Sequence, residues 1–251
     1  EAVGKNVSKF KVGDKVMAET GLTCGAYAEY ICLLEDELIV HQPENISPEE
    51  ATGIIDGACT ALAFFTDSVS ITKGQKVLIN GASGSIGTAA IQLAKQYGAE
   101  VTAVCSTKNK ALVLDLGADA VLDYTTKVLE TTQEKFDIIF DTVGKISFGK
   151  GKKLLTKKGI FLTTVMSFPA LLNMLFVSPF SNQKFKFAAT GMRKQDLRMR
   201  DLIQISNLLA SGSLTPVIDR VYSLDQVQDA HAYVDLGHKR RNVVINMNQT
   251  N

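Results

Sequence analysis

The chain has 251 residues, enough to bury a sizeable hydrophobic core without disulfide or metal staples. Its 27 basic and 26 acidic residues nearly cancel, which argues against a nucleic-acid or membrane-surface partner and favours a small-molecule ligand. The four cysteines form no C-x-x-C pair and the first residues form no apolar leader, so we expect reduced thiols in a cytoplasmic protein.

Residues 1–56 carry short strand-like segments that are broken by glycine and proline. We expect strands at residues 15–18, 26–33 and 38–42. This pattern is typical of an antiparallel or barrel-like unit.

A different pattern begins at VLINGASGSIGTAAIQLAKQYGA, residues 77–99. Residues 76–80 form an apolar strand, and the apolar residues from Ile86 to Tyr97 recur on one helical face. Gly98 ends this helix, and residues 100–105 read as the next strand. The order of strand, glycine turn, helix and strand predicts a parallel crossover.

The alternation continues toward the C-terminus and predicts an α/β fold with a doubly wound parallel sheet. After about residue 193 it gives way to a second region of mixed helices and strands. We expect helices at residues 110–116, 196–210 and 224–236, and strands at residues 120–122, 136–140, 159–164, 185–189, 217–222 and 242–247.

Residues 160–180 lie within the longest run without a charged side chain, and their length would suit a membrane span. Two prolines, an asparagine and several hydroxyl side chains lie within it. We therefore favour a buried strand followed by an apolar loop or helix, and we expect no membrane span.

The glycine turn has the spacing Ala82-x-Gly84-x-x-Gly87. This is the dinucleotide fingerprint with alanine in place of the first glycine, where a tight turn normally needs glycine. Gly84 would admit a pyrophosphate, Gly87 would let the helix pack closely on the strand, and the helix start would offer N–H groups to the phosphates. The alternative is a purely structural turn.

The end of the second strand indicates which nucleotide would bind. A site that prefers NAD places a carboxylate there, but this sequence has Cys105 followed by Ser106, Thr107, Lys108, Asn109 and Lys110. Hydroxyl and ammonium groups suit a 2'-phosphate, so we expect NADPH. The alternative is an ordinary solvated helix start.

Several stretches in a fixed order resemble the medium-chain dehydrogenase/reductase superfamily, in particular its zinc-free quinone oxidoreductase branch that includes zeta-crystallin. They are VGKNVSKFKVGDKV, GAYAEY, SPEEA, TAL, VLINGASGSIGTAAIQLAK, LGADAVLDY, FDIIFDTVG and PVIDRVYSLDQVQDAH. The resemblance implies a Rossmann dinucleotide-binding domain at residues 57–193, inserted in a GroES-like, β-rich catalytic domain at residues 1–56 and 194–251. Family members carry further residues before this start, so we expect an N-terminally truncated chain with an incomplete catalytic domain.

The resemblance also implies roles for individual residues. At the pyrophosphate it places Ala82, Ser83, Gly84, Ser85, Ile86 and Gly87, and around the adenosine 2'-phosphate Ser106, Lys108, Asn109 and Tyr124, although Tyr124 could instead be a core residue. Near the nicotinamide half and its crevice it places Thr60, Thr142, Val143, Gly144, Thr163, Thr164 and the segment 241–243.

The implied activity is an NADPH-dependent oxidoreductase that transfers hydride to a quinone or an α,β-unsaturated carbonyl. No catalytic residue is assigned, and the proton donor is solvent, Tyr27 or a group upstream. The resemblance further implies a homodimer, with residues 168–180 facing the substrate or the partner.

Two other functions stay open: a zinc-dependent alcohol dehydrogenase of the same superfamily, and a non-catalytic NADPH-binding protein. We expect no metal, because the cysteine lobe of the zinc branch is missing and Cys59 lies beyond the position of its zinc ligand. The histidines at 41, 231 and 238 also lack ligand spacing.

Overall fold

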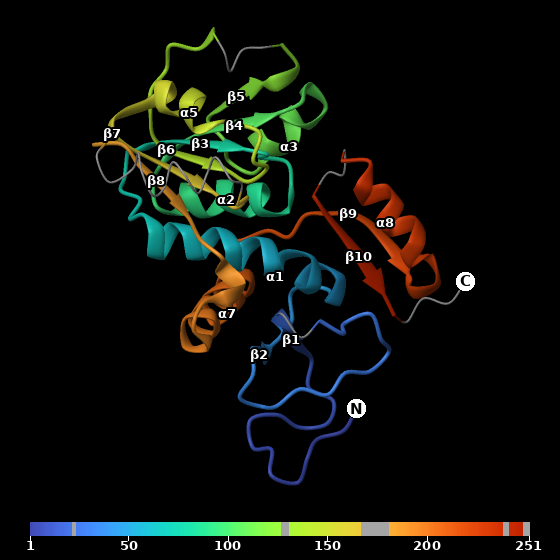
Figure 1. Cartoon of the computed structure of the whole chain (residues 1–251). Coiled ribbons are helices and arrows are strands. Elements are labelled where there is room, and N and C mark those ends of the chain that lie inside the picture. Colours follow the sequence, from blue (N-terminus) through green and yellow to red (C-terminus); the bar gives the residue numbers. More distant parts are fainter. Residues whose placement is uncertain (22–23, 127–130, 167–180, 238–240, 248–251) are drawn as a thin grey trace. The chain divides into compact units, whose positions relative to one another are not determined.

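The computed structural model describes residues 1–21, 24–126, 131–166, 181–237 and 241–247 (Figure 1). The chain divides into two compact units. Unit 1 comprises Glu1–Cys59 and Gly191–Asn251, and unit 2 comprises Thr60–Thr190. The assignment of residues 57–193 and their flanks to two functional domains stays a prediction.

Unit 2 contains a six-stranded sheet in the order β5-β4-β3-β6-β7-β8, and every neighbouring pair is parallel. The predicted parallel α/β fold is therefore confirmed. The longest strand, β7, begins four residues before its predicted start, because Leu155 already pairs with Phe136 across a bulge in the register. The strands are β3 Lys76–Asn80, β4 Glu100–Cys105, β5 Ala120–Asp123, β6 Phe136–Asp141, β7 Leu155–Thr163 and β8 Lys184–Phe187.

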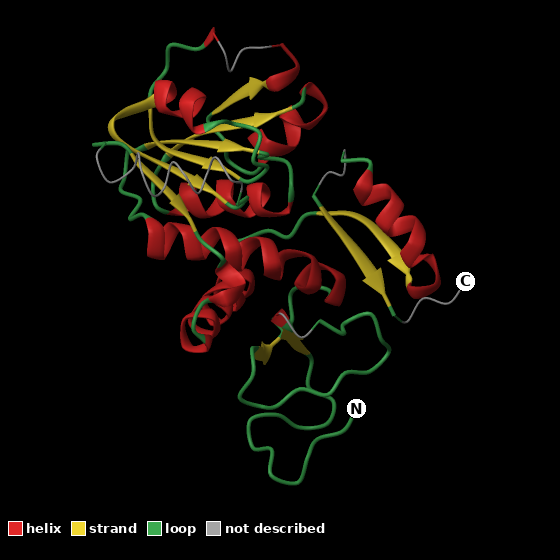
Figure 2. Ribbon diagram, in the orientation of Figure 1, coloured by secondary structure: helices red, strands yellow, loops and turns green. Residues whose placement is uncertain are grey.

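Helices cover both faces of this sheet (Figure 2). Alternate residues of a strand point to opposite faces, so both faces must be apolar when both are covered. One face carries an aromatic cluster in which Phe161 stacks on Phe185 at 5.5 Å and Phe148 meets both rings edge-on. On β6, Phe140 instead contacts Phe64 and Phe65. The near-continuous apolar strands of the sequence are explained by this two-sided burial.

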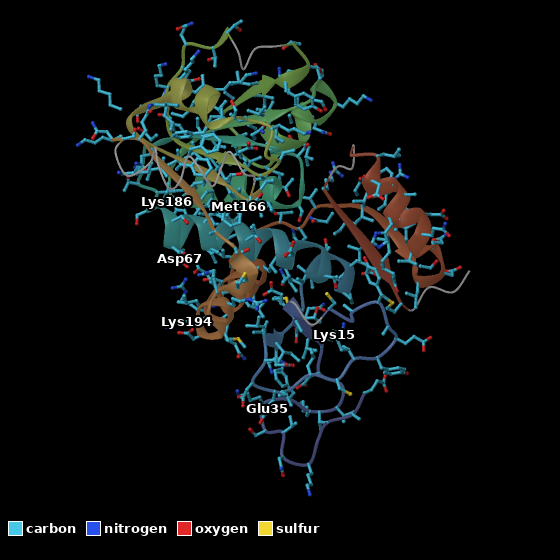
Figure 3. All side chains as sticks on the ribbon, in the orientation of Figure 1. Lys15, Glu35, Asp67, Met166, Lys186 and Lys194 are labelled. Atoms are coloured by element: carbon cyan, nitrogen blue, oxygen red, sulfur yellow. The ribbon has the colours of Figure 1, made fainter. Side chains whose placement is uncertain are left out.

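Among the described residues of the chain, four α-helices lie wholly or partly in unit 2: α1 Pro48–Ala63, α2 Ser85–Gln96, α3 Lys110–Asp115 and α5 Phe148–Leu154. A π-helical turn at Phe64–Ser68 follows α1, and Lys186 Nζ donates to its Ser68 carbonyl at 2.5 Å (Figure 3). Neither α1 nor α5 is among the helices predicted from the sequence. The start of α1 does have a sequence signal, because Ser47 and Glu50 form a reciprocal capping box that encloses Pro48, the first residue of the helix.

Where the structure describes unit 1, it contains two small sheets. An antiparallel pair joins β1 Val16–Ala18 to β2 Ile39–His41, and a parallel pair joins β9 Ile218–Ser223 to β10 Asn242–Asn246. Helix α8, Val227–Asp235, connects β9 and β10, and α7 spans Gln195–Ala210.

The predicted strand at residues 26–33 is wrong. This segment is irregular and leaves Tyr27 and Tyr30 exposed, with 59% and 71% of their surface accessible. No strand in the described residues pairs with it. An extended segment needs a hydrogen-bonded neighbour, which local apolar spacing cannot reveal.

In the described part of the chain, no helix has both the length and the apolar character that crossing a membrane requires. The apolar run of residues 160–180 falls into two parts. Its first residues, 160–163, belong to β7, whereas residues 167–180 lie outside the described residues.

Candidate functional site

The strand order creates a switch point between β3 and β6. The chain proceeds outward from β3 to β4 and β5, returns to β6 on the other side of β3, and continues outward to β7 and β8. Sheets of this kind bind ligands at the carboxyl ends of the two central strands. Here those ends are Asn80 and Asp141, which pair in register.

The turn after β3 is built around Gly81. Its φ of +78° is left-handed, and an added Cβ would lie 2.3 Å from Val143 Cγ2 and 2.5 Å from Thr142 Oγ1. The next residue, Ala82, is fully buried and donates its N–H to Val104 O at 3.1 Å. Our expectation that Ala82 occupies a position needing glycine is therefore wrong, because Gly81 makes the tight turn one residue earlier.

Gly84 and Gly87 differ in what surrounds them. An added Cβ at Gly87 would lie 2.2 Å from Gly81 O and 2.7 Å from the backbone of Ala82, so only glycine lets α2 begin against the turn. At Gly84 the nearest atom would be Gly81 O at 3.3 Å, and its φ of −83° suits any residue. The protein itself therefore restricts residue 84 much less than residue 87.

The start of α2 offers hydrogen-bond donors at this turn. The N–H of Thr88 is bonded back to Gly84 O at 2.9 Å. The preceding N–H groups, on Ser85, Ile86 and Gly87, have no partner within the helix. The positive end of the helix dipole adds to them, so the turn fits an anionic diphosphate.

Ser83, Ser106 and Asn109 come together beside the turn. Asn109 Nδ2 donates to Ser83 Oγ at 2.9 Å and lies 3.4 Å from Ser106 Oγ. This contact connects the glycine turn to the loop after β4. Lys108 precedes Asn109 in the short 3-10 turn Thr107–Asn109, and it is exposed.

A carboxylate that the sequence analysis missed lies next to this loop. Asp123 ends β5 and pairs in register with Cys105. It accepts hydrogen bonds from the Thr107 hydroxyl and from Thr125 N and Oγ1, the latter two at 2.8 and 2.7 Å. These bonds, the one from Thr107 first, lower the pKa of Asp123. The following residue, Tyr124, is 56% exposed, so the alternative that it is a core residue is wrong.

The predicted nicotinamide residues lie on the β6 side of the switch point. Thr142 Oγ1 donates to Asn80 O at 2.8 Å, and Thr164 Oγ1 donates to Thr142 O at 3.2 Å. Thr163 is buried, and its hydroxyl accepts the Val165 N–H at 3.2 Å, so its side chain is engaged by its own loop.

The remaining predicted site residues, Thr60, Tyr27 and the segment 241–243, are divided between the two units. Thr60 Oγ1 lies 3.4 Å from Thr190 Oγ1 in unit 2. Tyr27 and the segment 241–243 belong to unit 1, and their roles stay predictions. Within the residues that the structure describes, no group of three or more His, Cys, Asp or Glu side chains is arranged to hold a metal ion.

The cysteines lead to a prediction about thiol reactivity. Burial, with a contribution from the charge of Asp123, raises the pKa of Cys105 to about 11, and burial also raises the pKa of Cys59. At pH 8 only about one Cys105 thiol in a thousand is then a reactive thiolate. We expect iodoacetamide to label the exposed Cys24 and Cys32 quickly in the native protein, and all four cysteines after denaturation. Rapid native labelling of Cys59 or Cys105, detected by peptide mass spectrometry, would contradict this.

Comparison with known proteins agrees with the fold. Residues 116–245 match the family described as zinc-binding dehydrogenase. The chain is 33% identical to the mitochondrial NAD(P)H oxidoreductase RTN4IP1 of Mus musculus, over 97% of this chain and 67% of the relative. It is 30% identical to the 2-methylene-furan-3-one reductase of Solanum lycopersicum, over 97% of this chain and 60% of that protein.

Among solved structures, the quinone oxidoreductase from Coxiella burnetii superimposes with a TM-score of 0.84 at 26% identity. The match covers 97% of this chain and 75% of that one. The family match spans more than half of the chain, and the mouse relative is matched over two thirds of its length. The chain therefore belongs to the medium-chain dehydrogenase/reductase superfamily of oxidoreductases.

Proposed function

We propose that the protein is an NADPH-dependent oxidoreductase that transfers hydride to a quinone or an α,β-unsaturated carbonyl compound. The observation that carries this proposal is the turn of residues 81–87, which opens the 12-residue helix α2 at the switch point of the sheet. The names of the relatives support the acceptor class, because one is a quinone oxidoreductase and another reduces a 2-methylene-furan-3-one.

Each half of the cofactor would meet different residues. The N–H groups of residues 85–87 bind the diphosphate, and Ser106 and Lys108 bind the adenosine 2'-phosphate. The loop of residues 142–144 holds the nicotinamide half. The cofactor supplies the hydride, so the protein has to bind, orient and exclude water rather than supply a nucleophile.

Lys108→Ala tests the preference for NADPH. Loss of a charge-assisted hydrogen bond should weaken NADPH binding by about 1 to 3 kcal/mol, or about five-fold to 150-fold in Kd, and leave NADH nearly unchanged. Titration of the two nucleotides against the variant measures this. Lys158→Ala is the matched control, because it removes a lysine on β7 that is also exposed. Equal losses for NADPH and NADH in the Lys108 variant would refute the phosphate assignment.

The activity itself is tested by following the absorbance of NADPH with a panel of quinones and enones. Oxidation of NADPH by members of the panel supports the proposal. Tight NADPH binding with no oxidation would favour a non-catalytic NADPH-binding protein. Stoichiometric zinc together with alcohol oxidation would favour the alcohol dehydrogenase alternative.

Homodimer formation and a cytoplasmic location stay predictions of the sequence analysis. The mouse relative is named as mitochondrial, so the compartment of this chain needs its own measurement. Sedimentation of the purified protein and fractionation of the cells that make it would test the two.

A further inference from the structure

A buried carboxylate joins the two strands of the switch point. Asp141, the last residue of β6, has no accessible surface. Its Oδ1 accepts hydrogen bonds from Asn80 Nδ2 at 2.8 Å, from Val143 N at 3.1 Å and from Gly144 N at 2.9 Å. Its Oδ2 accepts from Ile146 N at 2.8 Å. All four donors are amide N–H groups, and three of them belong to the loop that follows β6.

Both oxygens of Asp141 serve as hydrogen-bond acceptors. Four N–H groups point at the two oxygens of the Asp141 side chain, and each oxygen accepts at least one hydrogen bond. Clusters of backbone N–H groups stabilise buried anions in the same way. An asparagine at the same place would present one oxygen and one NH₂ group. The NH₂ group would face an N–H donor, leaving at least one buried donor without an acceptor.

The loop of residues 142–146 makes further contacts besides its hydrogen bonds to Asp141. Thr142 donates both its N–H and its hydroxyl to Asn80 O, at 3.1 and 2.8 Å. Gly144 has a φ of +73°, and an added Cβ there would lie 2.8 Å from Val165 Cβ. Asp141 is therefore the centre of a clamp that fixes residues 142–146 against β3, directly beside the glycine turn.

We propose that Asp141 is a positioning residue, which holds the loop of residues 142–146 in the shape that receives the nicotinamide half of the cofactor. This inference rests on the proposed function. The four donors to the Asp141 carboxylate include neither residues 81–87 of the glycine turn nor Lys108, which serve the diphosphate and the adenosine. Loss of that carboxylate should therefore affect the two halves of NADPH unequally.

The test compares two ligands in Asp141→Asn. One is NADPH, and the other is 2',5'-ADP, which carries the adenosine and its phosphates but no nicotinamide. By calorimetry we expect the Kd of 2',5'-ADP to change less than about two-fold and that of NADPH to rise about ten-fold. We also expect kcat to fall, because the bound nicotinamide is no longer held in one orientation.

Asp137→Asn is the matched control. Asp137 lies on the same strand near its amino end, and its carboxylate accepts from Lys76 N at 3.0 Å and Thr156 Oγ1 at 3.2 Å. Four residues of strand place it about 13 Å from Asp141, away from the carboxyl end. We expect this variant to lose stability without changing the ratio of the two dissociation constants.

Equal weakening of both ligands in Asp141→Asn, or no change in either, overturns the positioning role. If Asp141→Asn does not fold, Asn80→Ala replaces it, because this variant keeps the three loop bonds and the Thr142 bonds to Asn80 O, and removes only the hydrogen bond that joins the Asp141 carboxylate to β3. A selective loss of NADPH affinity then supports the role, and an unchanged ratio overturns it. Failure of both ligands to bind the unmodified protein would overturn the proposed function instead, so the two failures are distinguishable.

Discussion

Gly87→Ala is expected to lower the free energy of unfolding of unit 2 by about 1 to 3 kcal/mol, the usual cost of overpacking. The new Cβ would lie 2.2 Å from Gly81 O and 2.7 Å from Ala82 C and Cα. These are backbone atoms of a turn between a buried strand and a helix, so they cannot rotate away as a side chain can. Alanine gains roughly 1 kcal/mol of helix propensity over glycine, and the clash outweighs this gain. Denaturation by urea, followed by circular dichroism, measures the difference.

Gly149→Ala is the matched control for that experiment. Gly149 also lies in a helix, α5, but an added Cβ there meets no atom within 4 Å. Helix propensity then acts alone, and the variant should be as stable as the parent protein or more stable by up to about 1 kcal/mol. A neutral Gly87→Ala, or equal effects of the two substitutions, would show that the close packing of α2 on its turn does not constrain residue 87.

The unit from β3 to β4 could be predicted from the sequence because its determinants are local. A five-residue strand with an apolar centre, a glycine turn and one helical period lie within about 30 residues, as a parallel crossover needs. The helical period of the apolar residues indicates where α2 lies, and Gly98 indicates where it ends. The structure places β3, α2 and β4 within one or two residues of the expected limits.

Features that depend on distant contacts could not be predicted in this way. Asp141 is 61 residues from Asn80, and only the pairing of β3 with β6 brings them together. Asp123 approaches Cys105 because β5 lies beside β4, although the local pattern suggested a site without a carboxylate. The segment 26–33 shows the opposite error, because its apolar spacing predicts a strand for which the described residues supply no partner.

Asp123 places a negative charge near the loop that we expect to choose between NADPH and NADH. The rule for NAD looks for a carboxylate at the end of the second strand, where this chain has Cys105. The carboxylate of Asp123 lies one strand to the side and is engaged by Thr107, the neighbour of Lys108. Its negative charge opposes a 2'-phosphate, whereas the lysine favours one. The measured ratio of NADPH to NADH affinity therefore reports the balance of the two charges, and Lys108→Ala shifts that balance toward NADH.

Gly84→Val is expected to abolish nucleotide binding while the fold survives. Gly84 is the N-cap of α2, with φ −83° and ψ 179°, an extended conformation that a β-branched residue adopts readily. The nearest atom to an added Cβ is Gly81 O at 3.3 Å, which requires an adjustment of only a few tenths of an ångström. The fold should therefore tolerate valine far better than unit 2 tolerates Gly87→Ala.

The binding site should not tolerate valine at this position. A diphosphate must approach the backbone closely at the second glycine of the fingerprint, and the branched side chain would occupy that space. We expect NADPH and NADH to lose at least about 100-fold in affinity, or about 2.7 kcal/mol, because they share the diphosphate. Gly84→Ala should lose less, since it adds a single methyl group. Titration of both nucleotides, with an unfolding curve for each variant, separates this result from the Lys108 effect, which is confined to NADPH. Full retention of NADPH affinity by a folded Gly84→Val protein would mean that no diphosphate crosses this turn.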